Sequence, residues 1–305
     1  MSLLYSATSL EKGLKTLFLQ NFSAESTLAD RLCYVESSAS DKEKYEWLGQ
    51  APQMAELVGE RKITPLSSTG YELENTTYES TVSISRNHLE DNQTGSIRRR
   101  IQQMAQTASA HVNKLVINAL INGTTNTGYD GAAFFANSHT ARGDSGAQDN
   151  LLAGSATTTS GLATDLAAAK AAMLNFLDEA GEPFHGDGNL ALTVVAPPAL
   201  EKNFREVLSA GIISQTASQV MLAPGQSGMA DLIISPRLTD ADDWYVLRTD
   251  NLARGLIFQQ RSPIEFSALE SNTESSFLKE VYLYGCRARY GVGYGFWQSA
   301  IKTVN

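Results

Sequence analysis

The chain has 305 residues, of which 42% are hydrophobic and 19% are charged, and this composition is typical of a globular protein rather than a disordered or membrane protein. Its formal charge of -9 and its isoelectric point near 5.0 argue against tight nucleic-acid binding, because affinity for phosphate comes from clustered Lys and Arg. The N-terminal segment lacks the apolar core of a signal peptide, and no run approaches the roughly 20 apolar residues of a membrane helix.

The first 90 residues predict an arm and a hairpin. We interpret residues 1–40 as an arm that contains a helix around Leu10–Phe22, rather than as part of a core. Apolar residues within 58–90 alternate in part and are interrupted at Ser67–Gly70, which predicts a long hairpin. This hairpin either projects from the body or lies on its surface.

One long helix is predicted over about 95–121. Apolar residues recur there at spacings of three or four, Thr94 is a candidate N-cap, and Asn122-Gly123 closes the pattern. At about 1.5 Å per residue the helix would be about 40 Å long, comparable to the width of a domain. It serves either as a spine or as an ordinary core-facing helix.

The middle of the chain predicts a polar loop and a second helix. Residues 136–161 are rich in small and polar residues without a sustained period, and they predict an extended surface loop. A helix with a core face from Leu162 to Leu177 follows, with Ser160 as its cap and its end before Gly181.

The remaining segments predict an α+β unit. An apolar strand, Leu190–Ala196, precedes a helix opened by Pro197-Pro198. Further strands are predicted at Leu232–Ser235, Trp244–Leu247, Leu256–Gln260 and Ile264–Leu269. In a last strand over Phe277–Tyr290, the tyrosines and Cys286 share one face, whereas Arg287 and Arg289 lie on the other.

One short motif suggests a serine hydrolase. The tetrapeptide Gly143–Gly146 is similar to the nucleophile segment of trypsin-like proteases, and His139 lies just upstream of Ser145. The strand pattern and disulfides of those enzymes are absent. A solvated turn therefore explains the tetrapeptide better than a catalytic serine.

No metal, cofactor or phosphate site is predicted. The histidines lack the spacing that places two ligands on one metal: His88, His111, His139 and His185. Three aspartates are interpreted as solvated loop carboxylates: Asp130, Asp144 and Asp149. Three alternating glycines are predicted to allow close packing or a bend in a strand: Gly291, Gly293 and Gly295. Cys33 and Cys286 fit no CxxC spacing, which indicates a reducing compartment.

Several segments in order resemble the major head subunit family of Mu-like phages and prophages. They begin with EWLGQAPQMAELVGERKITPL and YELENTTYESTVSISRNHLEDNQTGSIRRRIQQMA. The next, LINGTTNTGYDGAAFFANSHT, is similar to that family's Tyr-Asp-Gly turn, aromatic pair and histidine. LTVVAPPALEKNFREVL and YGCRARYGVGYGFWQSA agree with the family in order and spacing. The resemblance spans roughly 43–300, and one difference is Thr140, where the family often has proline.

The resemblance implies the Hong Kong 97-type phage capsid fold. This α+β fold has an N-terminal arm, an extended β-hairpin loop, a peripheral domain with a long spine helix, and an axial domain. On this sequence the implied parts are the arm at 1–44, the extended loop region at 45–92, the peripheral domain at 93–159, the axial domain at 160–262 and terminal strands returning to the peripheral domain at 263–305.

The implied function is that of a major capsid protein and not of an enzyme. Copies of the subunit would form pentamers and hexamers of an icosahedral head that encloses double-stranded DNA. Expected partners are scaffold, portal and decoration proteins and loosely touched DNA, with no membrane and no cofactor. The virion capsid would be assembled in the cytoplasm of the bacterial host. The alternative with the same fold is an encapsulin-like nanocompartment shell subunit.

Two groups of charged residues are candidates for contacts between subunits. Glu60, Arg61 and Lys62 lie near the base of the predicted hairpin and are expected either to form intersubunit ion pairs and hydrogen bonds or to be solvated. Arg98, Arg99 and Arg100 oppose the dipole of the long helix near its N-terminus, which favours a partner for them. That partner is either a neighbouring subunit's carboxylates or packaged DNA, and the alternative is a solvated helix face.

Overall fold

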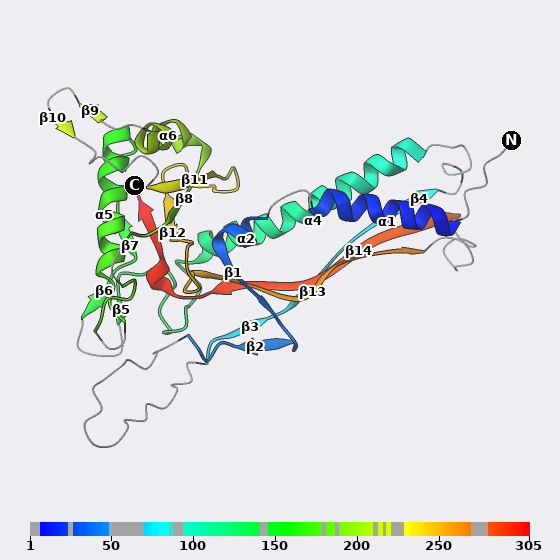
Figure 1. The fold of residues 1–305 in the computed structure, drawn as a ribbon, viewed down its shortest axis with the longest axis horizontal. Helices are drawn as coiled ribbons and strands as arrows, with labels where there is room; N and C mark the ends of the chain where they lie inside the picture. Colours follow the sequence, from blue (N-terminus) through cyan, green and yellow to red (C-terminus); the bar gives the residue numbers. More distant parts are fainter. Residues whose placement is uncertain are drawn as a thin grey trace, which may run out of the picture.

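The computed structural model of the chain is built around a long four-stranded sheet and a shorter five-stranded sheet (Figure 1). The structure describes residues 7–23, 27–48, 70–85, 87, 94–140, 146–178, 181–186, 189–209, 213–215, 218–220, 229–269 and 280–305. The two sheets lie at opposite ends of an elongated molecule, and the chain passes from the long sheet to the short one near its C-terminus (Figure 1). No helix in these ranges is long and apolar enough to span a membrane.

The four-stranded sheet has the order β1-β13-β14-β4. Its strands are β1 (Cys33–Ser37), β13 (Leu256–Leu269), β14 (Val281–Tyr294) and β4 (Thr76–Ser85). Strand β1 runs parallel to β13, and the other pairs are antiparallel. The two strands predicted around 256–269 are one strand, whose register with β14 shifts on either side of Ser262. Pro263 lies at this irregularity. Proline has no amide hydrogen to donate, so the hydrogen-bond ladder is interrupted there.

Helices α1 (Ala7–Ser23), α2 (Leu28–Leu32) and α4 (Thr94–Asn122) cover one face of this sheet (Figure 1). The predicted long helix is therefore confirmed. Leu14 and Phe18 of α1 are buried in one cluster with Ile101 of α4 and Tyr284 of β14. The interpretation of the first 40 residues as an arm outside the core is wrong for α1, because its apolar face is part of that core.

The five-stranded sheet has the order β11-β8-β12-β15-β7. Its strands are β11 (Ala230–Ile234), β8 (Leu192–Ala196), β12 (Trp244–Arg248), β15 (Ala300–Val304) and β7 (Leu151–Ala153). Helices α5 (Thr159–Asn175) and α6 (Glu201–Ser209), the latter preceded by the 3-10 turn η1 (Pro198–Leu200), accompany this sheet. A small hairpin joins β9 (Ile213–Gln215) to β10 (Ser218–Val220).

Helix α5 differs slightly from its prediction. The N-cap is Thr158, whose hydroxyl accepts a hydrogen bond from the Gly161 amide at 3.2 Å, and not Ser160. The helix ends at Asn175, because the backbone of Phe176 is extended. The predicted core face is confirmed, since Leu162, Leu166 and Met173 are buried.

The terminal strands divide between the two sheets. Strand β14 lies in the four-stranded sheet, as expected, but β15 pairs with β12 and β7 in the five-stranded one. The turn η2 (Trp297–Ser299) connects them. The expectation that all strands after residue 263 return to the sheet of the long helix is therefore wrong for β15, and the division into five parts stays a prediction.

The segment 136–161, predicted as a surface loop, is partly buried and partly regular. It contains the pair β5 (His139–Thr140) and β6 (Ala147–Gln148) and the edge strand β7. His139 and Asn150 have no solvent exposure. The sequence pattern misled here because polar residues that are buried and hydrogen-bonded look like loop residues.

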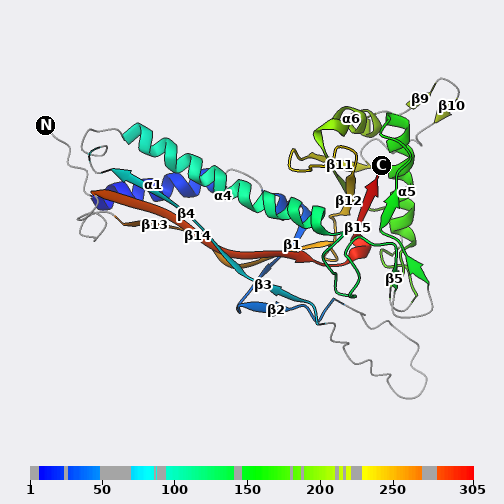
Figure 2. The same ribbon diagram turned by 180° about the vertical axis from the view of Figure 1, so that it is seen from behind.

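The predicted hairpin at 58–90 has a different pairing in its described part. Strand β4 pairs with β14, and β3 (Glu72–Glu74) pairs with β2 (Lys42–Lys44). The first half of the predicted hairpin lies outside the described residues. The two-stranded ribbon β2–β3 lies on the side of the long sheet opposite α1 and α4 (Figures 1 and 2).

Candidate functional site

The ribbon β2–β3 lies on the uncovered face of the long sheet and is anchored to that sheet. Its antiparallel register places Lys42 opposite Glu74 and Lys44 opposite Glu72, and the paired charges lie 3.1 and 3.2 Å apart. All four side chains are largely exposed, so these ion pairs add little to stability. The ribbon's position must therefore come from contacts at its base.

A turn at residues 38–41 fixes the start of the ribbon. The Glu43 carboxylate accepts hydrogen bonds from the Ser38 hydroxyl and from the amides of Ala39 and Ser40 at 2.8 to 3.0 Å. The Ser38 hydrogen bond, followed by the two amides, lowers the pKa of Glu43 to about 2. The buried Asn75 side chain donates to the Ser38 hydroxyl and to the Ser40 carbonyl, which joins this turn to the end of β3.

Two tyrosines and a glutamine tie the ribbon to the central strands. The Tyr45 hydroxyl donates to Gln259 Oε1 of β13 at 2.7 Å, and the Gln259 amide donates to the Leu73 carbonyl of β3 at 3.3 Å. The Tyr71 hydroxyl accepts from the Tyr294 amide of β14 at 2.7 Å. Burial raises the pKa of Tyr45 and of Tyr71. Hydrogen bonds to the central strands therefore anchor the chain on both sides of residues 49–69.

Close packing at this crossing explains the glycine series predicted to allow tight contacts. A Cβ atom on Gly291 would lie 2.7 Å from the Glu74 carbonyl oxygen, and one on Gly293 would lie 2.8 Å from the Tyr71 hydroxyl. Residues 71–74 can cross β14 at this distance only because Gly291 and Gly293 have no side chains on the crossing face. The prediction for these glycines is confirmed.

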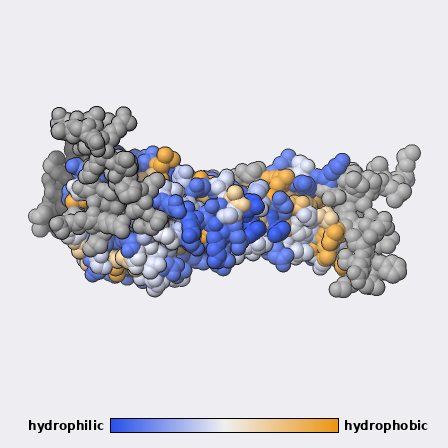
Figure 3. Space-filling model, turned by 90° about the horizontal axis from the view of Figure 1, so that it is seen from below, coloured by the Kyte–Doolittle hydropathy of each residue, from blue (hydrophilic) through white to orange (hydrophobic). Residues whose placement is uncertain are grey.

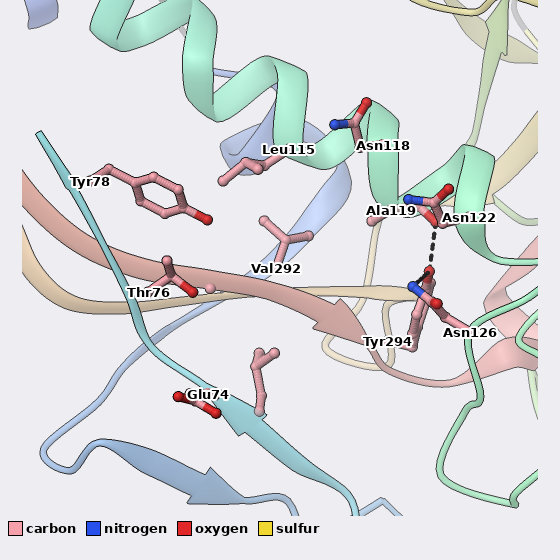
Figure 4. Close-up of a pocket in the computed structure, with 12 residues that line it drawn as sticks. Glu74, Thr76, Tyr78, Leu115, Asn118, Ala119, Asn122, Asn126, Val292 and Tyr294 are labelled. Carbon is pink, nitrogen blue, oxygen red and sulfur yellow. Dashed lines mark hydrogen bonds between the residues drawn. The ribbon is translucent and has the colours of Figure 1, made fainter. Parts of the chain in front are cut away.

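A polar groove runs beside the base of the ribbon (Figure 4). It has a volume of about 290 Å³ and lies between the C-terminal half of α4 and strands β3, β4 and β14. Asn118 and Asn122 of α4 face Glu74 and Tyr78 across it (Figure 4). The Tyr294 hydroxyl at its end donates to the Ala119 carbonyl at 2.9 Å. The groove is lined by amides, hydroxyls and the Glu74 carboxylate, and among the described residues its lining holds no histidine, cysteine, lysine or serine that could act with this carboxylate.

The surface on the ribbon side of the molecule is mainly hydrophilic. Figure 3 shows apolar residues there only as small separate patches. Trp47, beside the ribbon, is 40% exposed and contacts the rings of Tyr34, Tyr45 and Phe296. Contacts made through this face would therefore be polar, with single aromatic residues among them.

The predicted contact residues have different positions in the structure. Arg98, Arg99 and Arg100 are exposed on the first turns of α4, between the buried Ile97 and Ile101. Within the described part of the chain, none of these guanidinium groups forms an ion pair. Glu60, Arg61 and Lys62 lie outside the described residues, and so do His88, Asp144 and Ser145.

His139 is a structural residue and not an accessible base. Its Nδ1 lies 2.5 Å from Asp130 Oδ2, its Nε2 lies 3.1 Å from Asn150 Oδ1, and its ring stacks on Trp297 at 4.2 Å. Both ring nitrogens are occupied and the side chain has no solvent exposure. A hydrolase that uses His139 as its base is incompatible with this environment.

Other polar residues are also engaged in the fold. His111 Nδ1 lies 2.8 Å from the Tyr290 hydroxyl, and the ring contacts Tyr78. Burial, followed by the charges of Lys114 and Arg237, lowers the pKa of His111. Among the described residues, no group of three or more His, Cys, Asp or Glu side chains is arranged to hold a metal ion.

His185 makes stability depend on pH. Its Nε2 donates to the Gln298 carbonyl at 2.8 Å, and its Nδ1 accepts from Arg248 at 2.8 Å, so the folded protein holds a neutral ring. Burial lowers the pKa of His185 to about 4 from its usual 6.5. Its stabilising contribution is therefore complete above pH 6.5 and is lost as the pH falls from 6.5 towards 4.

We predict that acid destabilises the wild type more than His185→Gln. The glutamine can keep both hydrogen bonds without titrating, so the difference between the two proteins should grow by up to about 3 kcal/mol between neutral pH and pH 4. Urea unfolding at a series of pH values measures it. Parallel stability curves for the two proteins would show that His185 is not the group that titrates.

Contacts between residues far apart in the chain were not predicted from the sequence. Tyr45, Gln259 and Asn75 hold the ribbon, yet no local pattern marks them, because their partners are up to 214 residues away. Asn150 was also missed. Its only sequence signal is that an asparagine within a Ser- and Gly-rich segment directly precedes the apolar pair Leu151-Leu152.

Comparison with protein families gives a match over most of the chain. The family model described as the Mu-like prophage major head subunit gpT matches residues 7–160 and 233–305. The Mu-like prophage FluMu major head subunit of Haemophilus influenzae is 25% identical over 267 residues, which are 87% of this chain and 62% of that protein. The major capsid protein of Escherichia phage Mu is 24% identical over 275 residues, 90% of this chain and 65% of its own. This chain thus spans less than two thirds of the length of both relatives.

Solved structures share the fold at low identity. The procapsid of bacteriophage JBD30 matches with a TM-score of 0.56 and 24% identity, covering 98% of this chain and 76% of that one. The virus-like particle from Pyrococcus furiosus matches with a TM-score of 0.57 and 10% identity, covering 96% and 98%. These similarities confirm the predicted α+β fold of the Hong Kong 97 type.

Proposed function

Because this chain belongs to the family of the Mu-like prophage major head subunit gpT, we propose that it is the major capsid protein of a Mu-like tailed bacteriophage. Its copies assemble into the pentamers and hexamers of an icosahedral head that encloses double-stranded DNA. The observation that carries this proposal is the family match, which includes both the long sheet and the terminal strand of the five-stranded sheet.

The structure supports the proposal through its shape and its anchored ribbon. An elongated subunit can reach several neighbours at once, and many weak contacts then act together. We propose that ribbon β2–β3, with the chain between its strands, is the extended loop that lies over a neighbouring subunit. Its base is held by Tyr45, Asn75 and Gln259, so a contact made further out would be transmitted to the long sheet.

The candidate contact residues remain part of this proposal. Glu60, Arg61 and Lys62 lie between β2 and β3 in the sequence, and we propose that they form intersubunit ion pairs. Arg98, Arg99 and Arg100 are exposed without an ion pair to any described residue. Their partner is either a neighbouring subunit or DNA.

Further partners follow from the proposed role. A head of this kind requires a scaffold and a portal, and decoration proteins can bind its surface. The subunit would be made in the cytoplasm of the bacterial host and act in the virion without catalysing a reaction. An encapsulin-like compartment is less favoured, because the family match is to phage head subunits.

Sedimentation velocity of the purified chain, expressed with and without its genomic neighbours, tests this function. We expect capsomers or megadalton particles when the neighbours are present. A monomer that persists at high concentration under both conditions would contradict the proposal. Nuclease-protected DNA in the particles would distinguish a phage head from a compartment that holds enzymes.

A further inference from the structure

The long helix α4 has an unusual charge for this chain. It contains Arg98, Arg99, Arg100 and Lys114 but no Asp or Glu, although the chain has a formal charge of -9. All four cations are exposed. The exposed positions between them are neutral and polar: Gln103, Gln106 and Thr107. The outer face of α4 therefore carries positive charges at its first turns and at Lys114, with no negative charge between them.

Neighbouring elements add to this positive face. Arg237, from the connection after β11, donates to the Ala110 carbonyl of α4 at 3.4 Å and is itself exposed. Lys12 and Lys15 are exposed on α1, whose N-terminal half lies at the same end of the molecule as that of α4 (Figure 1). We call Arg98, Arg99, Arg100, Lys114 and Arg237 the α4 stripe.

The described lysines and arginines divide into those that have a carboxylate partner and those that have none, and the α4 stripe belongs to the second group. Among the described residues outside the stripe, seven lysines and arginines lie within 4.0 Å of a carboxylate: Lys42, Lys44, Lys202, Arg205, Arg248, Arg289 and Lys302. Across the described ranges, no member of the stripe has such a partner. The carboxylate of Asp30, on the adjacent helix α2, instead accepts a hydrogen bond from the Thr27 hydroxyl.

The two sides of the long sheet therefore present different charge patterns. On the ribbon side, the lysines of β2 pair with the glutamates of β3, and Arg289 pairs with Asp41. On the side of α4 (Figure 2), the members of the α4 stripe have no such partner among the residues that the structure describes. A closed shell has one side that faces its contents, so a difference of this kind indicates which side meets a polyanion.

From this complementarity we propose that the α4 stripe contacts the phosphate backbone of double-stranded DNA inside the head. This inference rests on the proposed function. From Arg98 to Lys114 the helix rises about 24 Å, a length over which duplex DNA presents several phosphates. Contacts to phosphate carry no sequence information, and so few cations give weak, salt-sensitive binding. Such binding suits DNA that must enter and leave the head.

The test compares two variants with the same change in net charge. The first is Arg98→Gln/Arg99→Gln/Arg100→Gln, and the matched control is Lys170→Gln/Lys202→Gln/Arg205→Gln on helices α5 and α6. Binding of unassembled full-length subunits to a short labelled duplex is measured by fluorescence anisotropy between about 50 and 200 mM salt. We expect the slope of log affinity against log salt to fall by about 3 in the arginine variant and to stay unchanged in the control.

Three results would overturn the inference. Equal slopes in the two variants would mean that net charge, and not the α4 stripe, governs binding. If the arginine variant lost binding to poly-glutamate but kept DNA binding, the α4 stripe would be a binding site for an acidic protein and not for DNA. A wild-type salt slope together with failure of the arginine variant to form particles would assign it to contacts between subunits. In that last case the proposed function stands, whereas absence of particles from the wild type would refute it separately.

Discussion

Replacing Asn150 with alanine is expected to lower the free energy of unfolding by about 4 kcal/mol. This fully buried amide joins three segments. Its Nδ2 donates to the carbonyls of Phe134, Trp297 and Ala300, and its Oδ1 accepts from the Ala136 amide and faces His139 Nε2. Alanine would leave these buried groups without partners, and each such group costs about 1–3 kcal/mol, although the costs do not add fully.

Equilibrium unfolding in urea measures this effect. The matched control is Asn189→Ala, because Asn189 is exposed and should change stability by less than about 0.5 kcal/mol. If the two variants unfolded at the same urea concentration, the hydrogen bonds of Asn150 would not be what holds residues 134–139 to the C-terminal turn.

Gly295→Ala should destabilise the protein by more than about 3 kcal/mol and prevent particle formation. A Cβ atom at this position would lie 2.3 Å from the carbonyl oxygen of Arg254, which is main chain and cannot rotate away. The Gly295 amide donates to the Gly255 carbonyl and the Phe296 amide to the Arg254 carbonyl, at 2.8 and 3.1 Å. The chain passes here from β14 of one sheet to β15 of the other. Pushing the segment at Gly295 away from the one at Arg254 would therefore tilt the two sheets relative to each other.

Gly13→Ala is the control for this substitution. A Cβ atom on Gly13 meets nothing within 4 Å, and the residue lies inside helix α1. Alanine there should raise the free energy of unfolding by about 0.5–1 kcal/mol. Thermal unfolding and sedimentation of both variants give the comparison. Normal particles from Gly295→Ala would show that the joint between the sheets tolerates a side chain.

The elements with a regular burial period were predictable from the sequence. Helix α4 has apolar residues every three or four positions, and strand β8 is a short apolar run between turn signals. In β14 the buried Tyr284, Cys286 and Ala288 alternate with more exposed residues. These patterns depend only on neighbouring residues and on the presence of one buried face.

Strand pairing and buried polar contacts were not predictable in the same way. Strand β4 pairs with β14, about 200 positions later, and its own sequence does not distinguish this from a hairpin with a nearby segment. Asn150 and His139 look like loop residues because their burial depends on partners elsewhere in the fold. The resemblance to a family supplied the fold class, whereas the position of β15 and the base of the ribbon required the structure.

The charged candidates show a similar limit. The sequence singled out Arg98–Arg100, and their position at the start of a helix could be predicted. Lys114 and Arg237 were not singled out, because Arg237 reaches Ala110 only through the tertiary fold. The positive face of α4 therefore emerges from the structure and not from any one run of basic residues.

Electron cryo-microscopy of the particles formed when this chain is expressed with its genomic neighbours tests the central claim most directly. The account predicts closed shells built of pentamers and hexamers, with ribbon β2–β3 lying over an adjacent subunit and α4 facing the interior. Particles that lack this subunit in their shell, or only isolated monomers in every preparation, would contradict it.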